Sequence, residues 1–268
     1  MTRLVAIGCI VVFWLTMMTL LVKREVLPAW VEGRRPTYRA AADHEDLPRR
    51  TQMGIYLGNR RVGTSRSRTR RDTDGALVIE STTAIEGEVP LLRFRSRFDI
   101  ASWLRVGPKG QLERFRIHAK APGFERTIHG EVAGRELVMT SRTGRRSETW
   151  TVPFERRDVL SHDLSVMEGL GDLRVGQRWC LQNLNPLTGR YSIVRVDVRR
   201  RETLTWRGRK VETFLVVSNI NGLELRAWVK PDGEVLRQEL PGLMLEREPY
   251  DEPGPGAQRD TDQRRPDS

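Results

Sequence analysis

The sequence predicts a mainly β protein in which an N-terminal transmembrane helix precedes a curved, half-barrel-like antiparallel sheet packed on one helix. Three observations support this fold class. The chain begins with a long uncharged apolar run, its middle alternates apolar and charged residues with a period of two, and turn residues separate the alternating segments. The predicted division is an anchor with its flanks over 1–30, a stalk over 31–50, a β domain over 51–249 and a disordered tail over 250–268.

The anchor is predicted from the run Leu4 to Val22, which holds 19 residues without a charge. As a helix this run is roughly 28 Å long, about the thickness of a hydrocarbon core. A cleaved signal peptide has a shorter apolar region, of about 7–15 residues, and ends at a small-residue site, whereas Lys23 follows directly here. Lipoprotein processing at Cys9 would need the apolar stretch before the cysteine. We therefore expect a single-pass signal anchor in a membrane.

The orientation of this anchor follows two rules that disagree. More basic residues follow the apolar run than precede it, which places the β domain in the cytoplasm by the positive-inside rule. A short N-terminal tail, one span and a large β domain are instead the plan of an extracytoplasmic signal-anchor protein. We favour the extracytoplasmic placement and leave the cytoplasmic one open.

The segments at either end of the β domain lack apolar periodicity. Residues 31–50 are polar and contain Pro36 and Pro48, so they are predicted to form a stalk. Residues 250–268 are rich in Pro, Gly, Asp and Arg, and their composition predicts disorder.

The predicted strands alternate apolar and charged residues. The clearest segments are Leu92–Ile100, Gln111–Ala119 and Ile193–Arg200, each with one apolar face and one charged face. The first two segments place a row of arginines on their charged face, and we take these as the candidate binding residues: Arg93, Arg95, Arg97, Arg114 and Arg116.

Turn residues connect the strands. Asn221-Gly222 predicts a two-residue type I′ turn that pairs Ile220 with Leu223 and Phe214 with Val229. Pro122-Gly123 predicts a second hairpin, with Ala119 opposite Phe124.

One helix, near 156–169, is predicted to interrupt the strands and to cover the apolar face of the sheet. Its signals are a proline before it, apolar residues at helical spacing and glycines after it, namely Pro153, Leu160, Leu164, Met167, Gly169 and Gly171.

The charge of the chain has two explanations. The net charge is +11, and nearly all the basic residues are arginine. Such a surface suits an acidic polymer or anionic lipid head groups, with nucleic acid disfavoured as a partner. A genome biased toward Arg codons produces the same excess without any ligand.

Catalytic and metal-binding patterns are missing from the sequence. It contains no GxSxG, HExxH, Walker or GxGxxG motif. Ser161-His162-Asp163 are consecutive, so on a helix their side chains diverge. In the predicted hairpin His118 and His129 lie roughly 13 Å apart, too far to share a metal. We predict no catalytic residue, no metal and no cofactor, and the alternative is an enzyme that uses Cys180 or His162.

The tryptophans of the β domain fit two interpretations. Apolar residues two positions away on the same strand favour a place in the core. Arginines between the tryptophans would instead suit a surface on which bases or sugars stack. We expect core positions for Trp103, Trp150, Trp179, Trp206 and Trp228.

Three segments resemble a bacterial envelope β domain. They are Gly54–Gly63, then Val175–Trp179 with Asn185–Gly189, and finally Ala227–Arg237. This kind of domain is similar to the half-barrels of lipoprotein carriers and also occurs ahead of transglutaminase-like domains. The resemblance implies a curved sheet on a helix with a cavity for an acyl chain or a peptide. It carries over no catalytic residue.

These observations favour a non-enzymatic, membrane-anchored binding or scaffold module of the envelope, with a lipid or peptide held in a β cavity. The first alternative is an electrostatic binder of an acidic polymer or anionic lipid through the arginine face. The second is an enzyme whose site has no recognisable motif.

Overall fold

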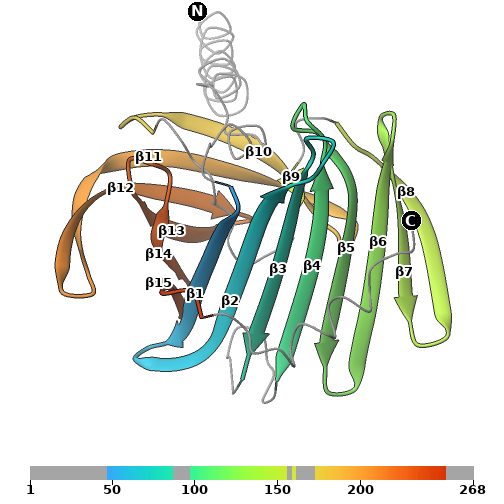
Figure 1. Ribbon diagram of the computed structural model, residues 1–268, viewed down its shortest axis with the longest axis horizontal. Helices are drawn as coiled ribbons and strands as arrows, with labels where there is room; N and C mark the ends of the chain where they lie inside the picture. Colours follow the sequence, from blue (N-terminus) through green and yellow to red (C-terminus); the bar gives the residue numbers. More distant parts are fainter. Residues whose placement is uncertain (1–46, 87–96, 156–158, 161–172, 252–268) are drawn as a thin grey trace, which may run out of the picture.

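The computed structural model describes residues 47–86, 97–155, 159–160 and 173–251. These residues form one sheet of 15 strands in the order β8-β7-β6-β5-β4-β3-β2-β1-β15-β14-β13-β12-β11-β10-β9. The pairing is antiparallel throughout, except that β9 runs parallel to β10. The described part of the chain contains no helix. The predicted curved antiparallel sheet is therefore confirmed (Figure 1).

The strands fall into two groups along the chain. The first group is β1 (Arg49–Leu57), β2 (Arg60–Arg71), β3 (Leu77–Ile85), β4 (Phe98–Val106), β5 (Leu112–Ala121), β6 (Phe124–Ala133), β7 (Glu136–Thr143) and β8 (Arg146–Pro153). The second is β9 (Val159–Leu160), β10 (Arg178–Asn185), β11 (Arg190–Trp206), β12 (Arg209–Ile220), β13 (Leu223–Val229), β14 (Val235–Leu240) and β15 (Leu243–Glu248).

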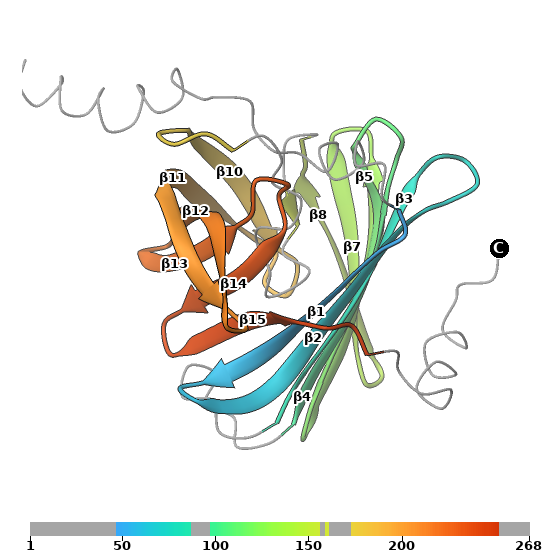
Figure 2. The same ribbon diagram turned by 60° about the vertical axis from the view of Figure 1, so that its left-hand side comes forward.

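Two meanders make up the sheet. Strands β1 to β8 follow one another in space as they do in the chain, and so do β9 to β15. The meanders join where β1 pairs with β15. The first and last of the described strands therefore lie inside the sheet, and its edges, β8 and β9, come from the middle of the chain. Figure 2 shows the two groups facing each other across the inner side of the curve.

Alternation along the strands matches the predicted faces. In β5, Phe115 and Ile117 are buried whereas Arg114 is exposed. In β11, Val194 and Val196 are buried. We call the side that carries these buried residues the inner face and the opposite side the outer face.

The turn predictions had different outcomes. Asn221 and Gly222 have positive φ angles of 52° and 87°, and Ile220 pairs with Leu223 as expected. At the second hairpin the predicted register was wrong, because Ala121, not Ala119, lies opposite Phe124. A proline followed by a glycine at positive φ suits a tight two-residue turn, which makes the residues flanking it the closing pair.

The inner face holds two separate hydrophobic clusters. The first lies mainly on β1 and β10 to β15 and is built from Met53, Ile55, Val62, Ile85, Leu173, Trp179, Val194, Val196, Val198, Phe214, Val216, Ala227, Val229, Val235, Leu243 and Leu245. The second lies mainly on β3 to β7 and is built from Leu77, Ile79, Leu104, Val106, Leu112, Phe115, Ile117, Ile128, Leu137, Met139, Phe154 and Leu184.

Buried hydroxyl groups separate the two clusters. Along β3 the inner face passes from Ile79 of the second cluster through Ser81 and Thr83 to Ile85 of the first cluster. Thr83 Oγ1 donates to Ser65 Oγ on the neighbouring strand at 2.8 Å. The band runs across four strands and consists of Thr51, Ser65, Ser67, Ser81, Thr83 and Ser102, all buried.

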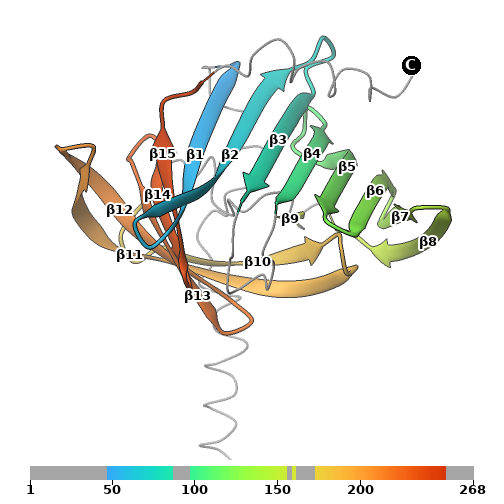
Figure 3. The same ribbon diagram turned by 90° about the horizontal axis from the view of Figure 1, so that it is seen from below.

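The hairpin of β10 and β11 brings the two ends of the sheet together. The Tyr191 hydroxyl donates to the carbonyl oxygen of Pro153 on β8. Arg126 Nη1 on β6 donates to the carbonyl oxygen of Leu187 at 3.1 Å. Figure 3 shows this hairpin crossing toward β8. The curved sheet is therefore held almost closed by side-chain contacts across its edges.

A polar network joins the two meanders on the outer face. The Glu248 carboxylate of β15 accepts hydrogen bonds from Arg61 Nη2 at 2.7 Å, Tyr56 Oη at 2.8 Å and Gln52 Nε2 at 3.3 Å. A Cβ at Gly54 would collide with this carboxylate, so glycine gives Glu248 room to lie across β1. The network therefore ties the last strand to the first.

Replacing Glu248 should change how stability depends on pH. The hydrogen bond from Arg61, helped by Tyr56 and Gln52, holds the pKa of Glu248 below its usual value of 4.5 even though burial opposes this shift. Because the pKa of Glu248 is lower in the folded state, this carboxylate stabilises the fold fully above pH 4.5. Its stabilising effect is lost as the pH falls toward the folded-state pKa. We expect the melting temperature to fall further between pH 7 and pH 3 for the native chain than for Glu248→Gln. If the melting temperatures of the two proteins changed with pH by the same amount, Glu248 would not be the source of this stability.

Four predicted segments fall wholly or largely outside the described residues. The anchor over 1–30 lies outside them, as do all of the stalk but 47–50, of which Arg49 and Arg50 belong to β1, and all of the tail but 250–251. Of the helix predicted near 156–169, only Val159 and Leu160 are described, and they form β9 instead. A short strand that pairs with β10 takes the place of helix at these two positions.

Among the described residues, no helix is both long and apolar enough to cross a membrane.

Candidate functional site

Three neighbouring strands place a tryptophan and several arginines side by side on the outer face. In the pairing of β4 with β5, Trp103 lies opposite Arg116 and Arg105 lies opposite Arg114. In the pairing of β5 with β6, Arg114 lies opposite Glu131. All five alternate with inner-face residues, and the pleat of the strands turns them outward.

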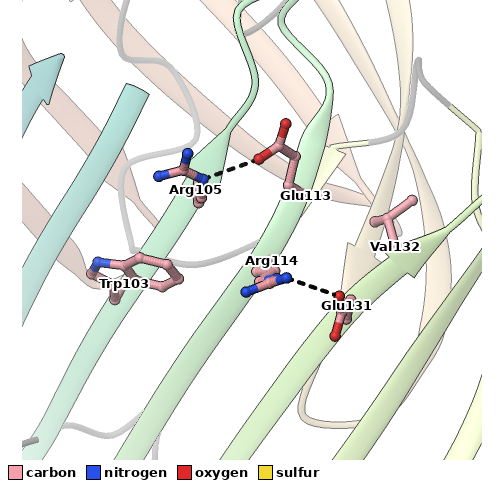
Figure 4. Close-up of a pocket in the computed structure, with 6 residues that line it drawn as sticks. All are labelled: Trp103, Arg105, Glu113, Arg114, Glu131 and Val132. Carbon is pink, nitrogen blue, oxygen red and sulfur yellow. Dashed lines mark hydrogen bonds and ion pairs between the residues drawn. The ribbon is translucent and has the colours of Figure 1, made fainter. Parts of the chain in front are cut away.

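A pocket of about 530 Å³ opens among these residues. Its volume lies within the range of about 300–1,000 Å³ that is typical of small-molecule sites. Figure 4 shows the side chains that line it, on β4, β5 and β6. We call it the Trp103 pocket, and its lining residues are Trp103, Arg105, Glu113, Arg114, Glu131 and Val132.

Arg105 is surrounded by carboxylates. Its Nη1 donates to Asp72 Oδ2 at 2.7 Å, and its Nε donates to Glu113 Oε2 at 3.1 Å. Its Nη2 donates to Asp74, which stands in the turn after β2. The hydrogen bond from the Thr73 backbone, followed by the one from Arg105, lowers the pKa of Asp72 below its ordinary value. Three acidic partners therefore fix this guanidinium and neutralise its charge.

The second arginine of the pocket is also paired. Arg114 Nη2 lies 3.3 Å from Glu131 Oε1, and both side chains are more than half exposed. Exposed ion pairs of this kind contribute only about 0–1 kcal/mol to stability. The consequence for the pocket is geometric, because the pair presents donors and acceptors together beside the Trp103 ring (Figure 4).

Trp103 differs from the other tryptophans of the sheet. Trp179 and Trp228 are buried in hydrophobic clusters, and Trp150 and Trp206 pack against them. Trp103 belongs to none of the three clusters formed by the described residues and is half-buried on the outer face. The predicted core position is thus confirmed for Trp179 and Trp228. Trp150 and Trp206 are half-buried at the margin of a cluster, and the prediction is wrong for Trp103, because odd-numbered residues of β4 face outward.

The three candidate arginines that the structure describes do not form one group. Arg93 and Arg95 lie outside the described residues. Arg114 and Arg116 flank the Trp103 pocket. Arg97 precedes β4, eight residues before Arg105, which is roughly 26 Å along a strand. It pairs there with Asp99 at 2.9 Å and with Glu86 at 3.5 Å.

Two histidines lie closer together than the sequence predicted. His118 is opposite Thr127 and His129 is opposite Arg116, so the two rings are diagonal neighbours on the outer face. Diagonal positions are roughly 7–8 Å apart, not 13 Å, and the error follows from the shifted hairpin register. Within the described strands and turns, no group of three or more His, Cys, Asp or Glu side chains could hold a metal.

The pKa of His129 reports on the charge of this face. Partial desolvation of the ring, followed by the cations of Arg116 and Arg142, lowers the pKa of His129 below its ordinary value. Arg142 lies on β7, opposite Thr127 and close to both histidines in the register. Two arginines, Arg116 and Arg142, therefore lie near His129 on the outer face beyond the pocket.

Of the two residues of the enzyme alternative, Cys180 and His162, the structure describes only Cys180. Cys180 lies on β10, opposite Arg195, with a free and half-buried thiol. His162 lies outside the described residues.

Sequence reasoning did not select five of the six pocket residues as candidate binding residues, namely Trp103, Arg105, Glu113, Glu131 and Val132. Arg114 was found because it belongs to an evident alternating segment. The strand Phe98–Val106 starts with the same period, so continuing the alternation past Ile100 would have placed Trp103 and Arg105 on the arginine face. The contact of Arg105 with Asp72 depends on the pairing of β3 with β4, which the alternation of residues alone does not give.

The fold and the pocket together define a curved, almost closed antiparallel sheet with a candidate ligand site on its outer face. The sequence matches no protein-family model, and no curated protein matches it. Among solved structures, it is similar to a crystal structure described as a β-barrel-like protein of domain of unknown function DUF1849 from Brucella abortus. The identity is 8%, the TM-score is 0.49, and the match covers 75% of this chain and 97% of that chain.

Proposed function

We propose that the protein is a non-enzymatic binding module of a bacterial cell envelope, and that it binds its ligand in the Trp103 pocket. One observation supports this above the others. A half-buried tryptophan stands in a pocket of about 530 Å³ beside two arginines that acidic residues hold in place. An aromatic surface with a few oriented polar groups is the usual composition of a ligand site. The apolar run Leu4 to Val22 supports attachment to a membrane.

Removing the Trp103 ring should abolish ligand-induced stabilisation. A ligand that binds only the folded state raises the melting temperature. We expect the full-length chain, in detergent micelles, to be stabilised by at least one of four probes: neutral oligosaccharides, acidic oligosaccharides, polyphosphate or phosphatidylglycerol vesicles. We expect Trp103→Ala to lose that stabilisation.

Trp206→Phe, at a tryptophan outside the pocket, is the matched control and should keep the response. A Trp103→Ala protein that responds like the native chain to every stabilising probe would refute binding at the pocket.

A second candidate function is electrostatic binding of an acidic polymer or anionic lipid by the outer face. The register of the strands favours it, because Arg116 on β5 lies opposite His129 and Arg142 on β7 lies opposite Thr127, on the same face. This mode predicts an affinity for polyphosphate that falls steeply between about 50 and 500 mM salt. Arg116→Glu should weaken it strongly, and an affinity unaffected by salt or by this substitution would exclude it.

The binding of a lipid or a peptide on the inner face of the sheet stays a prediction. Organic extraction of the purified full-length protein, followed by mass spectrometry, measures it directly. A bound acyl chain or peptide in a fixed ratio to protein is the expected result, and repeatedly empty protein would contradict it.

A further inference from the structure

Acidic residues outnumber the two arginines that line the Trp103 pocket. Arg105 and Arg114 supply two cations. Four carboxylates lie within 4 Å of their nitrogens, namely Asp72, Asp74, Glu113 and Glu131. A polyanion would meet four carboxylates as well as the two arginines, so these charges give it no net attraction to the pocket.

The pairing also sets which hydrogen bonds the pocket offers. Each arginine is tied to a glutamate that lines the pocket, Arg105 to Glu113 and Arg114 to Glu131. A guanidinium can only donate and a carboxylate can only accept. A ligand group that both donates and accepts, such as a hydroxyl, can bind both members of a pair. Charged groups of either sign satisfy one member and repel the other.

The Trp103 ring adds an apolar surface beside these pairs. It lies opposite Arg116 on β5 and Glu80 on β3, outside every hydrophobic cluster of the described residues. An aromatic ring displayed in this way can stack on a flat ligand. A sugar ring has one apolar face of C–H groups and a rim of hydroxyls, so it matches both the tryptophan and the ion pairs.

From this match we infer that the ligand of the Trp103 pocket is an uncharged saccharide, either a free sugar or a unit of a glycan polymer. This inference rests on the proposed function and names the ligand class of the same site. The sugar ring stacks on Trp103, and its hydroxyls bridge Arg105 to Glu113 and Arg114 to Glu131. Because no net charge is neutralised on binding, the affinity should hardly depend on salt.

Saturation-transfer NMR on the full-length protein tests the inference. The protein is held in a detergent without a sugar head group, since such a head group would compete for the pocket. The neutral probes are chitotriose, cellotriose and maltotriose, and the anionic probes are trigalacturonate and polyphosphate. The matching monosaccharides show whether a single free ring is enough or a longer glycan is needed.

We expect saturation to reach the C–H protons of a neutral trisaccharide. Its affinity should change by less than about twofold between 50 and 500 mM salt. Trp103→Ala should weaken it by about tenfold or more, the usual effect of losing an aromatic stacking surface. Trp103→Phe keeps a ring and should retain part of the affinity, while unchanged melting temperatures show that both variants fold.

Two results would overturn the inference in different ways. If only trigalacturonate or polyphosphate binds, and Trp103→Ala weakens that binding, the pocket is a ligand site but its ligand is anionic. If none of the probes binds, or Trp103→Ala leaves saccharide binding unchanged, the saccharide site is refuted, and the thermal-shift panel then decides whether the pocket binds anything at all.

Discussion

Leu104→Ala should destabilise the protein by about 2–5 kcal/mol, the usual cost of truncating a fully buried leucine. Leu104 is 0% exposed and lies at the centre of the second inner cluster. It stands between Ile79 on β3 and Phe115 on β5. The neighbouring strands hold their positions by hydrogen bonding, so the cavity left by the missing side chain cannot close. Urea unfolding of the full-length chain, followed by circular dichroism, measures the loss.

The control for this substitution is another leucine of the same sheet. Leu223 follows the turn at Asn221-Gly222 and is 49% exposed. Leu223→Ala removes the same atoms from a position that water already reaches. We expect it to change the free energy of unfolding by about 0.5 kcal/mol or less. Equal effects of the two substitutions would show that Leu104 does not lie in a packed core.

Gly63→Ala should lower the free energy of unfolding by about 1–3 kcal/mol, the second largest effect after that of Leu104→Ala. A Cβ at Gly63 would collide with the carbonyl oxygen of Ala84 and would lie 3.0 Å from Ile85 Cα. Both atoms belong to the backbone of β3, which cannot rotate away as a side chain could. Relief would require moving β3 relative to β2, and β3 is fixed on its other side by β4.

Thr82→Ala is the control for Gly63→Ala. It changes an exposed outer-face residue of β3, close to the collision but outside the inner face. Its expected effect on urea unfolding lies within about 0.5 kcal/mol. A Gly63→Ala protein as stable as Thr82→Ala would mean that β2 and β3 do not pair in the described register.

Much of the sheet could be predicted from the sequence because its signals are local. Alternation assigns Phe115 and Ile117 to the inner face, and Asn221-Gly222 sets the register of its hairpin. The pairing of β1 with β15 could not be predicted in this way. It joins residues almost 200 positions apart, and its specific signal, a glycine that makes room for Glu248, is visible only after the strands are paired.

The candidate site was harder to predict than the fold. An arginine row suggested a positive surface, and in the structure one of its members, Arg114, lines the pocket. The carboxylates that pair with the pocket arginines come from elsewhere. Asp72 and Asp74, in the turn after β2, pair with Arg105, and Glu131 on β6 pairs with Arg114. Cross-strand pairing decides whether an arginine is free or neutralised, so net charge alone could not distinguish an anion site from a site for uncharged ligands.

The measurement that tests the central claim most directly is hydroxyl-radical footprinting of the tryptophans in the folded full-length protein. The claim is that Trp103 is displayed on the outer face, whereas Trp179, 2% exposed, belongs to the core. We predict rapid oxidation of Trp103 and protection of Trp179 until the protein unfolds. Equal protection of both rings in the folded state would contradict the outer-face pocket and every function proposed for it.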